Sequence, residues 1–380
     1  MDSLMVAANI RNLSLLELFY TCVANLCKIM DGRGTKIADE QHHYIEKDDY
    51  NKCIYHKRDM DATERTVIVM KDADILIEIC DSTGDFDDTS EYQLLIRLLK
   101  ERTIIDDDGS RRLRQKEEVE NPSEVLLNPS DPEATFRYKA GGKHLGYVGN
   151  VVEAVGEKSS LVIDYDYQQN TYADNQFMKD YLNEKKDFSD GSFIVADGAY
   201  SGEENSRLAS EHNLKLVTTN FTGRKPDEIY ADFVFTEDGK YLIKCKNDCN
   251  PEECSYDPGN DRSVAYFQRS NCEECPYRER CQPRFLKTRV RKEVSWKSVG
   301  RAKQLQYMQT EEFSEYAKFR NGVEAIPSLL RRRYHVDKIP VHGKKRTRLF
   351  FGFKIAALDF QKLLDYTNSL DSHASNKKTA

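Results

Sequence analysis

Residues 193–202, FIVADGAYSG, carry the side chain with the most direct chemical potential. Four apolar residues predict a short buried strand, with Asp197 at its carboxyl end and Gly198 directly after it. Ligands of open α/β sheets bind beyond the carboxyl ends of strands, so a carboxylate there can reach a metal ion or a phosphate. The competing interpretation is that Asp197 caps the helix predicted over 203–213.

A second group consists of Arg320, Glu324 and Arg331, in the spacing R-x3-E-x6-R. Residues four apart share one face of a helix, and Arg331 returns close to that face about two turns later. A carboxylate between two guanidinium groups suits a site that holds a metal-bound phosphodiester. The same spacing is also that of an ordinary helical ion pair, which contributes a few tenths of a kcal/mol.

Six of the ten cysteines fall between Cys245 and Cys281. This clustering favours a metal site over disulfides, and it indicates that the chain occupies a reducing compartment. Cys272 and Cys275 have the spacing of zinc ligands, and 17 residues separate them from the cysteines upstream. We expect a structural Zn²⁺ ion held by four thiolates, with Cys245 or Cys249 as possible substitutes in the set Cys254, Cys272, Cys275 and Cys281.

The periodicity of apolar residues predicts the elements that must position these groups. Helices are expected over 14–30, within 38–80 with a break near Asp61, and over 91–102, followed by a charged linker or mobile loop at 103–125. Strands at 135–139, 145–155, 160–168, 193–197 and 214–219 alternate with helices at 173–183 and 203–213. A hairpin at 232–235 and 240–244 then precedes the cysteines, and helices follow at 300–308, 311–320 and 323–333. The pattern indicates a mixed α/β sheet with helices packed on it.

Charge is distributed unevenly along the 380 residues. The chain has a net charge of −7, yet residues 284–354 hold 19 Lys or Arg against 6 Asp or Glu, so the remainder carries −20. Basic clusters at 331–333 and 344–348 indicate a polyanionic partner such as nucleic acid. No run of 18 apolar residues exists, so we expect no membrane-spanning helix, and the N-terminus lacks the features of a signal peptide.

Together these features resemble the DDE transposases of bacterial insertion sequences. The resemblance includes NPSDPEATFRYKAGGKHLGYVGNVVE (128–153), IVADGAYSGEEN (194–205), the cysteine segment, FRNGVEAIPSLLRRRY (319–334) and VHGKKRTRLFFGFKIAAL (341–358). It implies an RNase H-like mixed sheet with flanking helices, a helical insertion after the first strand and a cysteine-rich insertion before the C-terminal catalytic helix. The corresponding divisions are a first strand at 1–12, a helical insertion and charged linker at 13–125, the central core at 126–222, the hairpin and cysteine-rich insertion at 223–295, and a basic helical part at 296–380.

The resemblance also implies an acidic triad that holds two Mg²⁺ or Mn²⁺ ions. Asp197 matches the second acidic residue and Glu324 the third, while the first is Asp2, in MDSLM, or Asp131, in SDPEA. The implied partners are double-stranded DNA, at transposon ends and target, and a second copy of the chain on that DNA. The residues expected to position phosphates are Arg320, Arg331, Arg332, Arg333, Lys344, Lys345 and Arg346.

If Asp2 is the first acidic residue, only Met1 precedes it, and the helical DNA-binding region found at the N-terminus of this family is absent. We therefore expect a transposase of the bacterial cytoplasm and nucleoid that lacks its N-terminal part, with its activity in question. Two other functions stay open from the sequence: a non-catalytic DNA-binding transposase fragment, and an RNase H-like nuclease that acts outside transposition.

Overall fold

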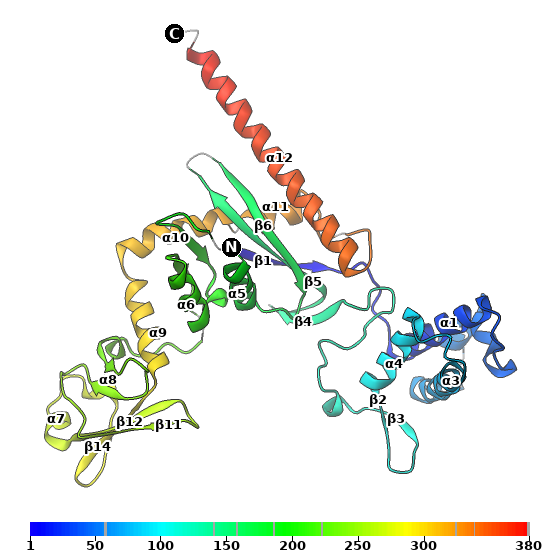
Figure 1. Ribbon diagram of the computed structural model, residues 1–380, viewed down its shortest axis with the longest axis horizontal. Coiled ribbons are helices and arrows are strands. Elements are labelled where there is room, and N and C mark those ends of the chain that lie inside the picture. The colour runs from blue at the N-terminus through cyan, green and yellow to red at the C-terminus, as the bar shows by residue number, and fades with distance from the viewer. Residues whose placement is uncertain are drawn as a thin grey trace. The chain divides into compact units, whose positions relative to one another are not determined.

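The computed structural model describes the chain except for residues 57–58, 140, 157–158, 185–186, 222, 324, 338 and 378–380, and of 321–323 and 370–377 it describes the backbone only. The chain divides into two compact units. One consists of Met1 with Asp174–Glu324, and the other of Asp2–Ala173 with Ala325–Ala380. Figure 1 shows the elements of both.

The sheet of the Asp2–Ala173 unit is antiparallel throughout. It consists of β1 (Asp2–Ala7), β4 (Thr135–Lys139), β5 (Gly142–Val155) and β6 (Ser160–Gln169). The long strand β5 pairs with each of the other three, and Asp2 of β1 lies opposite Val151. The three strands predicted between residues 135 and 168 are confirmed.

Two helices from the C-terminal part cover this sheet: α11 (Ala325–Arg332) and α12 (Lys344–Lys377). Their apolar side chains form one core with the strands, including Leu4, Tyr147, Tyr167 and Phe351. Phe351 approaches the sheet at Gly149, where an added Cβ would lie 2.5 Å from the ring. The helix α12, red in Figure 1, lies within the part predicted as basic and helical, 296–380, although its bounds were not predicted.

The helical insertion has its own core. Its long helices are α1 (Leu15–Gly32), α3 (Ala62–Thr83) and α4 (Ser90–Arg102), and the segment between α1 and α3 consists of the short helices η1 (Asp39–Ile45), α2 (Asp49–Asn51) and η2 (Lys52–His56). Asp61 and Glu64 form a capping box at the start of α3, which explains the predicted break.

The prediction of a linker or mobile loop at 103–125 is wrong in its first half. Strands β2 (Thr103–Ile105) and β3 (Arg111–Leu113) form a hairpin, followed by η3 (Lys116–Glu118). Arg111 pairs with Asp74 of α3 at 2.8 Å, and Arg112 bridges Asp106 and Glu118. The charged residues that suggested a solvated linker therefore form ion pairs within this segment and with α3.

The Asp174–Glu324 unit contains a parallel pair of strands, β7 (Phe193–Ala196) and β8 (Lys215–Thr218). Around them lie α5 (Asp174–Glu184), η4 (Gly198–Tyr200), α6 (Glu203–Glu211), η5 (Glu228–Asp232), α9 (Trp296–Tyr307) and α10 (Glu311–Val323). Val195 and Val217 pack against Phe313 of α10. Except for η4 and η5, which were not predicted, these elements match the predicted strands and helices within a few residues at each end.

The cysteine segment, residues 245–281, lies among further strands of this unit. The predicted hairpin is present as β9 (Val234–Phe235) and β10 (Leu242–Lys244). A second sheet, in the order β11-β12-β14-β13, consists of Glu253–Asp257, Arg262–Gln268, Arg289–Val294 and Arg284–Phe285 respectively, with the short helices α7 (Arg269–Glu273) and α8 (Arg278–Cys281). The sequence analysis missed this sheet.

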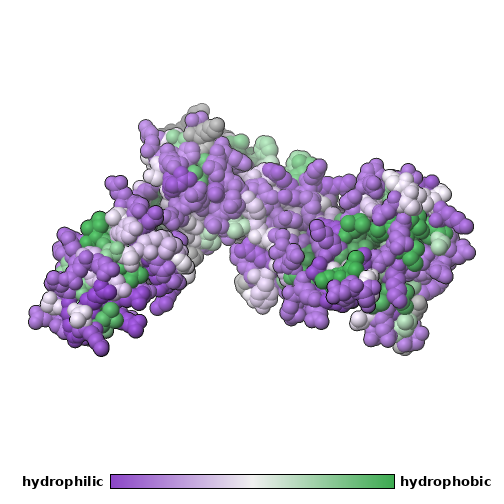
Figure 2. Space-filling model, turned by 60° about the horizontal axis from the view of Figure 1, so that its bottom comes forward, coloured by the Kyte–Doolittle hydropathy of each residue, from purple (hydrophilic) through white to green (hydrophobic). Residues whose placement is uncertain are grey.

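The fold is thus mixed α/β, as predicted. Figure 2 shows a face on which hydrophilic residues predominate and apolar residues form separate patches. In the described part of the chain, no helix is long and apolar enough to cross a membrane.

Candidate functional site

Asp197 lies at the carboxyl end of β7, as the sequence predicted. Its side chain is 35% exposed. The capping interpretation receives no support, because the Asp197 side chain makes no capping hydrogen bond to η4 and the N-cap of α6 is Gly202. The carboxylate is therefore available to other partners.

Those partners come from the end of β8 and the last turn of α10. Arg320 donates through Nη2 to Asp197 Oδ2 at 3.2 Å and through Nη1 to Thr219 Oγ1 at 2.9 Å. Asn220 donates to Asp197 Oδ1 at 3.4 Å. The Arg320 side chain is only 16% exposed. One guanidinium thus joins two strand ends to α10.

Thr219 and Asn220 were not singled out from the sequence. The available signal was their position at and directly after the end of the strand predicted at 214–219, because the carboxyl ends of parallel neighbours meet at one edge of a sheet. Glu324, the predicted third acidic residue, lies outside the described residues. The described part of α10 ends at Val323, so the role of Glu324 stays a prediction.

The two candidates for the first acidic residue have different surroundings. Asp2 is the first residue of β1, and its Oδ1 accepts a hydrogen bond from the Ser3 amide at 2.8 Å. The nitrogen of Met1, within the other unit, donates to Val195 O of β7 at 2.9 Å.

Asp131 is fully buried. Its Oδ1 accepts a hydrogen bond from the Tyr147 hydroxyl, and its Oδ2 has no partner among the described residues. Burial, and then the Asp131 carboxylate, raise the pKa of Tyr147. A carboxylate enclosed in this way is poorly placed to meet a DNA phosphate, so its burial favours Asp2.

Most of the predicted phosphate-binding residues are exposed. Arg331 of α11 donates to the Met5 carbonyl of β1 at 3.4 Å and lies 3.7 Å from Asp337. Lys344 donates to Gln168 of β6 at 2.8 Å. Four other predicted phosphate-binding residues have exposed side chains: Arg332, Arg333, Lys345 and Arg346. They are available to a polyanion, whereas Arg320 is held at Asp197.

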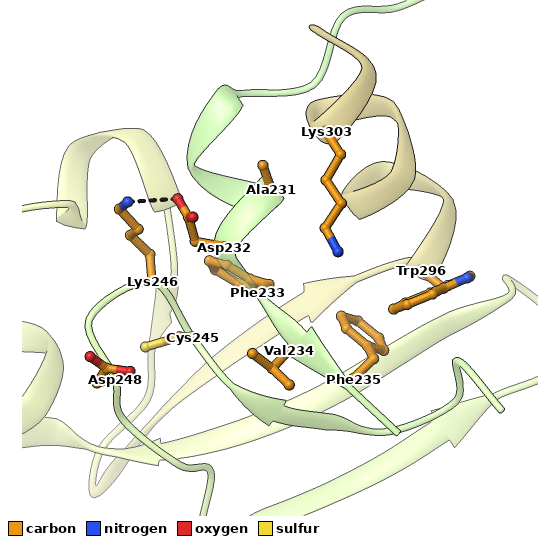
Figure 3. A pocket seen from close by; sticks show the side chains of 10 residues that line it. All are labelled: Ala231, Asp232, Phe233, Val234, Phe235, Cys245, Lys246, Asp248, Trp296 and Lys303. Atoms are coloured by element: carbon orange, nitrogen blue, oxygen red, sulfur yellow. Dashed lines mark hydrogen bonds and ion pairs between the residues drawn. The ribbon is translucent and has the colours of Figure 1, made fainter. Parts of the chain in front are cut away.

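Two pockets adjoin α9. One, of about 630 Å³, lies between the α6 N-terminus, β8 and α9, and is lined by Lys297, Arg301 and Thr218 among others. The second, of about 640 Å³, is shown in Figure 3. Phe233, Phe235 and Trp296 lie along one side of it, and Lys246 pairs with Asp232 across from Lys303. Phe233 and Phe235 are buried in a hydrophobic core, whereas the Trp296 ring is exposed and its centroid lies 6.0 Å from Lys303 Nζ.

The cysteine module places five thiols around one small cavity of about 30 Å³. They are Cys245, Cys249, Cys272, Cys275 and Cys281. Burial, and then the Cys281 and Cys245 thiols, raise the pKa of Cys272 to about 12. Cys254, which the sequence analysis included among the four ligands, is not in this set: it lies on β11 with its Sγ 3.0 Å from Ser263 Oγ. The arrangement therefore favours Cys245 or Cys249, the predicted substitutes, over Cys254 as the fourth ligand.

Comparison with known proteins adds one finding. Residues 246–364 match the family model of the transposase DDE domain. The matched segment extends from the cysteine module through α9, α10 and α11 into α12, and so includes Arg320 and Arg331. No curated protein and no solved structure matches the chain. Over this segment the chain is similar to the DDE domain of transposases.

Proposed function

We propose that the chain is a transposase that hydrolyses phosphodiester bonds at the ends of a bacterial insertion sequence and joins the freed strand to target DNA. The observation that carries the proposal is the contact between Asp197 and Arg320, a strand-end carboxylate held by the helix that belongs to the matched transposase segment. Its partners are double-stranded DNA and, on that DNA, a second copy of the chain, in the bacterial cytoplasm.

The proposed fold of the catalytic core is RNase H-like. Support comes from the antiparallel strands β1, β5 and β6 of one unit and, in the other, from the parallel pair β7 and β8 with Asp197 at its carboxyl end.

Asp2, Asp197 and Glu324 are the proposed ligands of two Mg²⁺ or Mn²⁺ ions. Carboxylate oxygens are the ligands these hard cations prefer, and the partly exposed Asp197 carboxylate fits them. When bound, two such ions activate the attacking oxygen and stabilise the leaving oxygen. Arg320 holds Asp197 through one nitrogen and Thr219 through another, which fixes the direction of the carboxylate before DNA binds.

Two displacements at phosphorus follow in the proposed reaction. In the first, a water oxygen bonds to the phosphorus at the transposon end and the P–O3′ bond breaks, which leaves a 3′-OH and a 5′-phosphate. In the second, that 3′-OH attacks a target phosphorus, and the P–O3′ bond of the target breaks in turn. The exposed arginines and lysines of α11 and α12 position the phosphates of the two DNA duplexes.

The test is Mn²⁺-dependent nicking of duplex DNA that carries the ends of the element. Asp197→Asn, Asp2→Asn and Glu324→Gln should each abolish nicking, while Asp190→Asn, a change at an exposed carboxylate before β7, should leave it unchanged. If Asp131→Asn abolishes nicking while Asp2→Asn does not, Asp131 is the first ligand. Nicking that persists in Asp197→Asn contradicts the mechanism.

A second measurement separates a catalytic from a merely DNA-binding protein. With Fe²⁺ in place of Mg²⁺ and ascorbate added, radicals formed at the metal cleave the backbone nearby. We expect cleavage near residues 2 and 197, lost in Asp197→Asn. Tight DNA binding without metal-dependent cleavage of DNA or protein supports the non-catalytic alternative, and nicking without any preference for element ends supports a nuclease outside transposition.

We further propose that the cysteine module binds one structural Zn²⁺ ion through Cys272, Cys275, Cys281 and a thiolate of Cys245 or Cys249. The cavity among these thiols has room for a single ion. The double variant Cys272→Ser/Cys275→Ser should lose one equivalent of zinc per chain, measured by mass spectrometry of the metal, whereas Cys254→Ser should retain it. Equal zinc in both variants contradicts this ligand set.

A further inference from the structure

A second cluster of metal-binding side chains lies in the helical insertion, outside the residues assigned above. His43 is on η1, Asp49 begins α2, and Cys53 is on η2. One ligand atom from each of the three residues lies within 4.8 Å of the other two. An imidazole, a carboxylate and a thiol, brought from three consecutive short elements, therefore meet at one place.

The separations are close to those of metal ligands. His43 Nδ1 is 2.8 Å from Asp49 Oδ2, and Cys53 Sγ is 3.4 Å from the same oxygen. The ligands of a tetrahedral zinc ion, with bonds of about 2.0–2.3 Å, stand about 3.3–3.8 Å apart. The separation of Cys53 Sγ and Asp49 Oδ2 already lies in this range, and that of His43 Nδ1 and Asp49 Oδ2 would have to widen by about half an ångström.

Neighbouring helices hold these ligands in position. Tyr20 of α1 donates its hydroxyl to Asp49 Oδ2 at 2.5 Å. Arg65 of α3 donates to the carbonyls of Cys53 and Ile54 at 3.0 and 2.9 Å. Such outer partners orient metal ligands in known sites. The backbone around Cys53 is a π-helix, a rare conformation that is found frequently at functional sites.

The cluster is buried on one side and open on the other. Asp49 is 5% exposed, whereas the His43 side chain is 37% exposed. An ion can enter along the imidazole, and water can occupy a fourth position on that side.

We propose that His43, Asp49 and Cys53 bind one Zn²⁺ ion, with a fourth position open to water. The mixed N, O and S donor set suits zinc and does not suit the Mg²⁺ of a phosphoryl-transfer site. Binding would release the thiol proton of Cys53 to solvent. The ion would cross-link η1, α2 and η2, which contain no long helix of their own, beside α1 and α3. The inference is independent of the proposed transposase activity.

The test uses the full chain, freed of metal by chelation and then loaded with ¹¹³Cd²⁺ as the probe. Cadmium NMR should show a resonance of a site with one sulfur ligand, well separated from that of the four-sulfur site in the cysteine module. His43→Ala should lose the one-sulfur resonance and one equivalent of bound zinc per chain. His42→Ala, at the exposed neighbouring histidine, should keep both.

The wild-type spectrum is measured without any substitution, so this part of the test does not depend on whether a variant folds. A wild-type chain that shows no one-sulfur resonance overturns the proposal, because His43 and Cys53 then serve only as hydrogen-bond partners of Asp49. Equal zinc content in His43→Ala and His42→Ala also overturns it. Cys53→Ala provides a second variant, in which the far-ultraviolet circular dichroism should stay that of the wild type while one equivalent of zinc is lost.

Discussion

Three aspartates of this chain show how surroundings decide the role of one residue type. Asp197 is partly exposed at a strand end and faces a guanidinium. Asp131 is fully enclosed and accepts a hydrogen bond from Tyr147. Asp49 is buried among a hydroxyl, an imidazole and a thiol. Of the three, only Asp197 is exposed enough to bind a metal ion that also contacts a DNA phosphate, which is the role proposed for it.

Replacement of Arg320 tests whether Asp197 must be held in place. Arg320→Lys should lower the rate of DNA nicking by about 10- to 100-fold, because a single ammonium cannot bridge Asp197 and Thr219 as the two guanidinium nitrogens do. Arg207→Lys is the matched control, since Arg207 makes exposed ion pairs with Glu204 and Glu211 on α6. DNA affinity, measured by fluorescence anisotropy, should change much less than the rate. Equal nicking rates in the two variants would show that Arg320 does not position the carboxylate.

Glu17 should give the helical insertion a stability that depends on pH. Burial by itself raises the pKa of Glu17, but hydrogen bonds from the Ser14 amide and from Tyr50 lower it to about 2, against an ordinary value of 4.5. A lowered pKa in the folded state stabilises the fold above pH 4.5, and this stabilisation is lost as pH falls toward 2. Glu17→Gln should therefore cost about 1–3 kcal/mol at pH 7 and progressively less below pH 4.5.

Thermal unfolding followed by helical circular dichroism measures this difference at pH 7, 4 and 2.5. Glu78→Gln, at an exposed position in α3, is the control. A gap between wild type and Glu17→Gln that stays constant over this pH range would contradict the assignment.

At the scale of the elements, predictability followed the length and the strength of the local pattern. The strands between residues 135 and 169 were predictable because β-branched and aromatic residues alternate between glycine-containing turns. The break before α3 was predictable from Asp61, which caps that helix. The position of Asp197 followed from the apolar strand before it, but its contact with Arg320 depends on tertiary packing that no local pattern contains.

The elements that the sequence did not predict also have physical features that explain why they were missed. The strands β11 to β14 carry charged residues at many positions and pair mainly with each other around the cysteines, so their alternation is weak. The bounds of α12, within the predicted helical part, were missed because it begins with a basic cluster and buries only part of its apolar surface, so its sequence lacks a clean amphipathic pattern. The site at His43, Asp49 and Cys53 was hidden because short 3₁₀ and π turns have no sequence period by which to align its ligands.

Gly149 is where α12 depends most closely on the sheet. Gly149→Ala should destabilise the fold by about 1–3 kcal/mol, because the new methyl group would overlap the buried Phe351 ring. Gly300→Ala is the matched control within α9, where nothing lies within 4 Å of an added Cβ. There the same change should stabilise by up to about 1 kcal/mol, because alanine favours the helix. The midpoint of urea unfolding measures both, and opposite signs are the expected result.

At the scale of the whole chain, two features point to assembly on DNA. The segment from residue 284 to 354 is basic, whereas the rest of the chain is acidic. This distribution of charge favours binding to a polyanion through the basic segment alone. The helix α12 adds an apolar surface beside that basic segment. Its large exposed side chains are Leu349, Phe353, Phe360, Leu363 and Leu364.

These side chains follow the spacing of a helix that pairs with another helix. Leu349, Phe353, Phe360 and Leu364 recur at intervals of four and seven residues and form one stripe, while Phe351, Ile355 and Leu358 are buried against the sheet on another face. An exposed stripe of this size marks an interaction site. We expect two copies to pair along this stripe in antiparallel orientation, because parallel pairing would place the exposed basic residues at the two starts of α12 side by side.

Phe360→Glu tests this pairing. The wild-type chain should elute with twice its mass of 44.0 kDa in light scattering after size exclusion, and Phe360→Glu should elute as a monomer, because a carboxylate would be buried in the middle of the paired stripe. Gln361→Glu adds the same charge to the same helix outside the stripe, so it should stay dimeric. A wild-type chain that is monomeric both alone and on element-end DNA, or a Phe360→Glu variant that remains a dimer, would exclude α12 as the interface. Since transposition must join two ends, the Phe360→Glu monomer should still nick single ends but lose strand transfer.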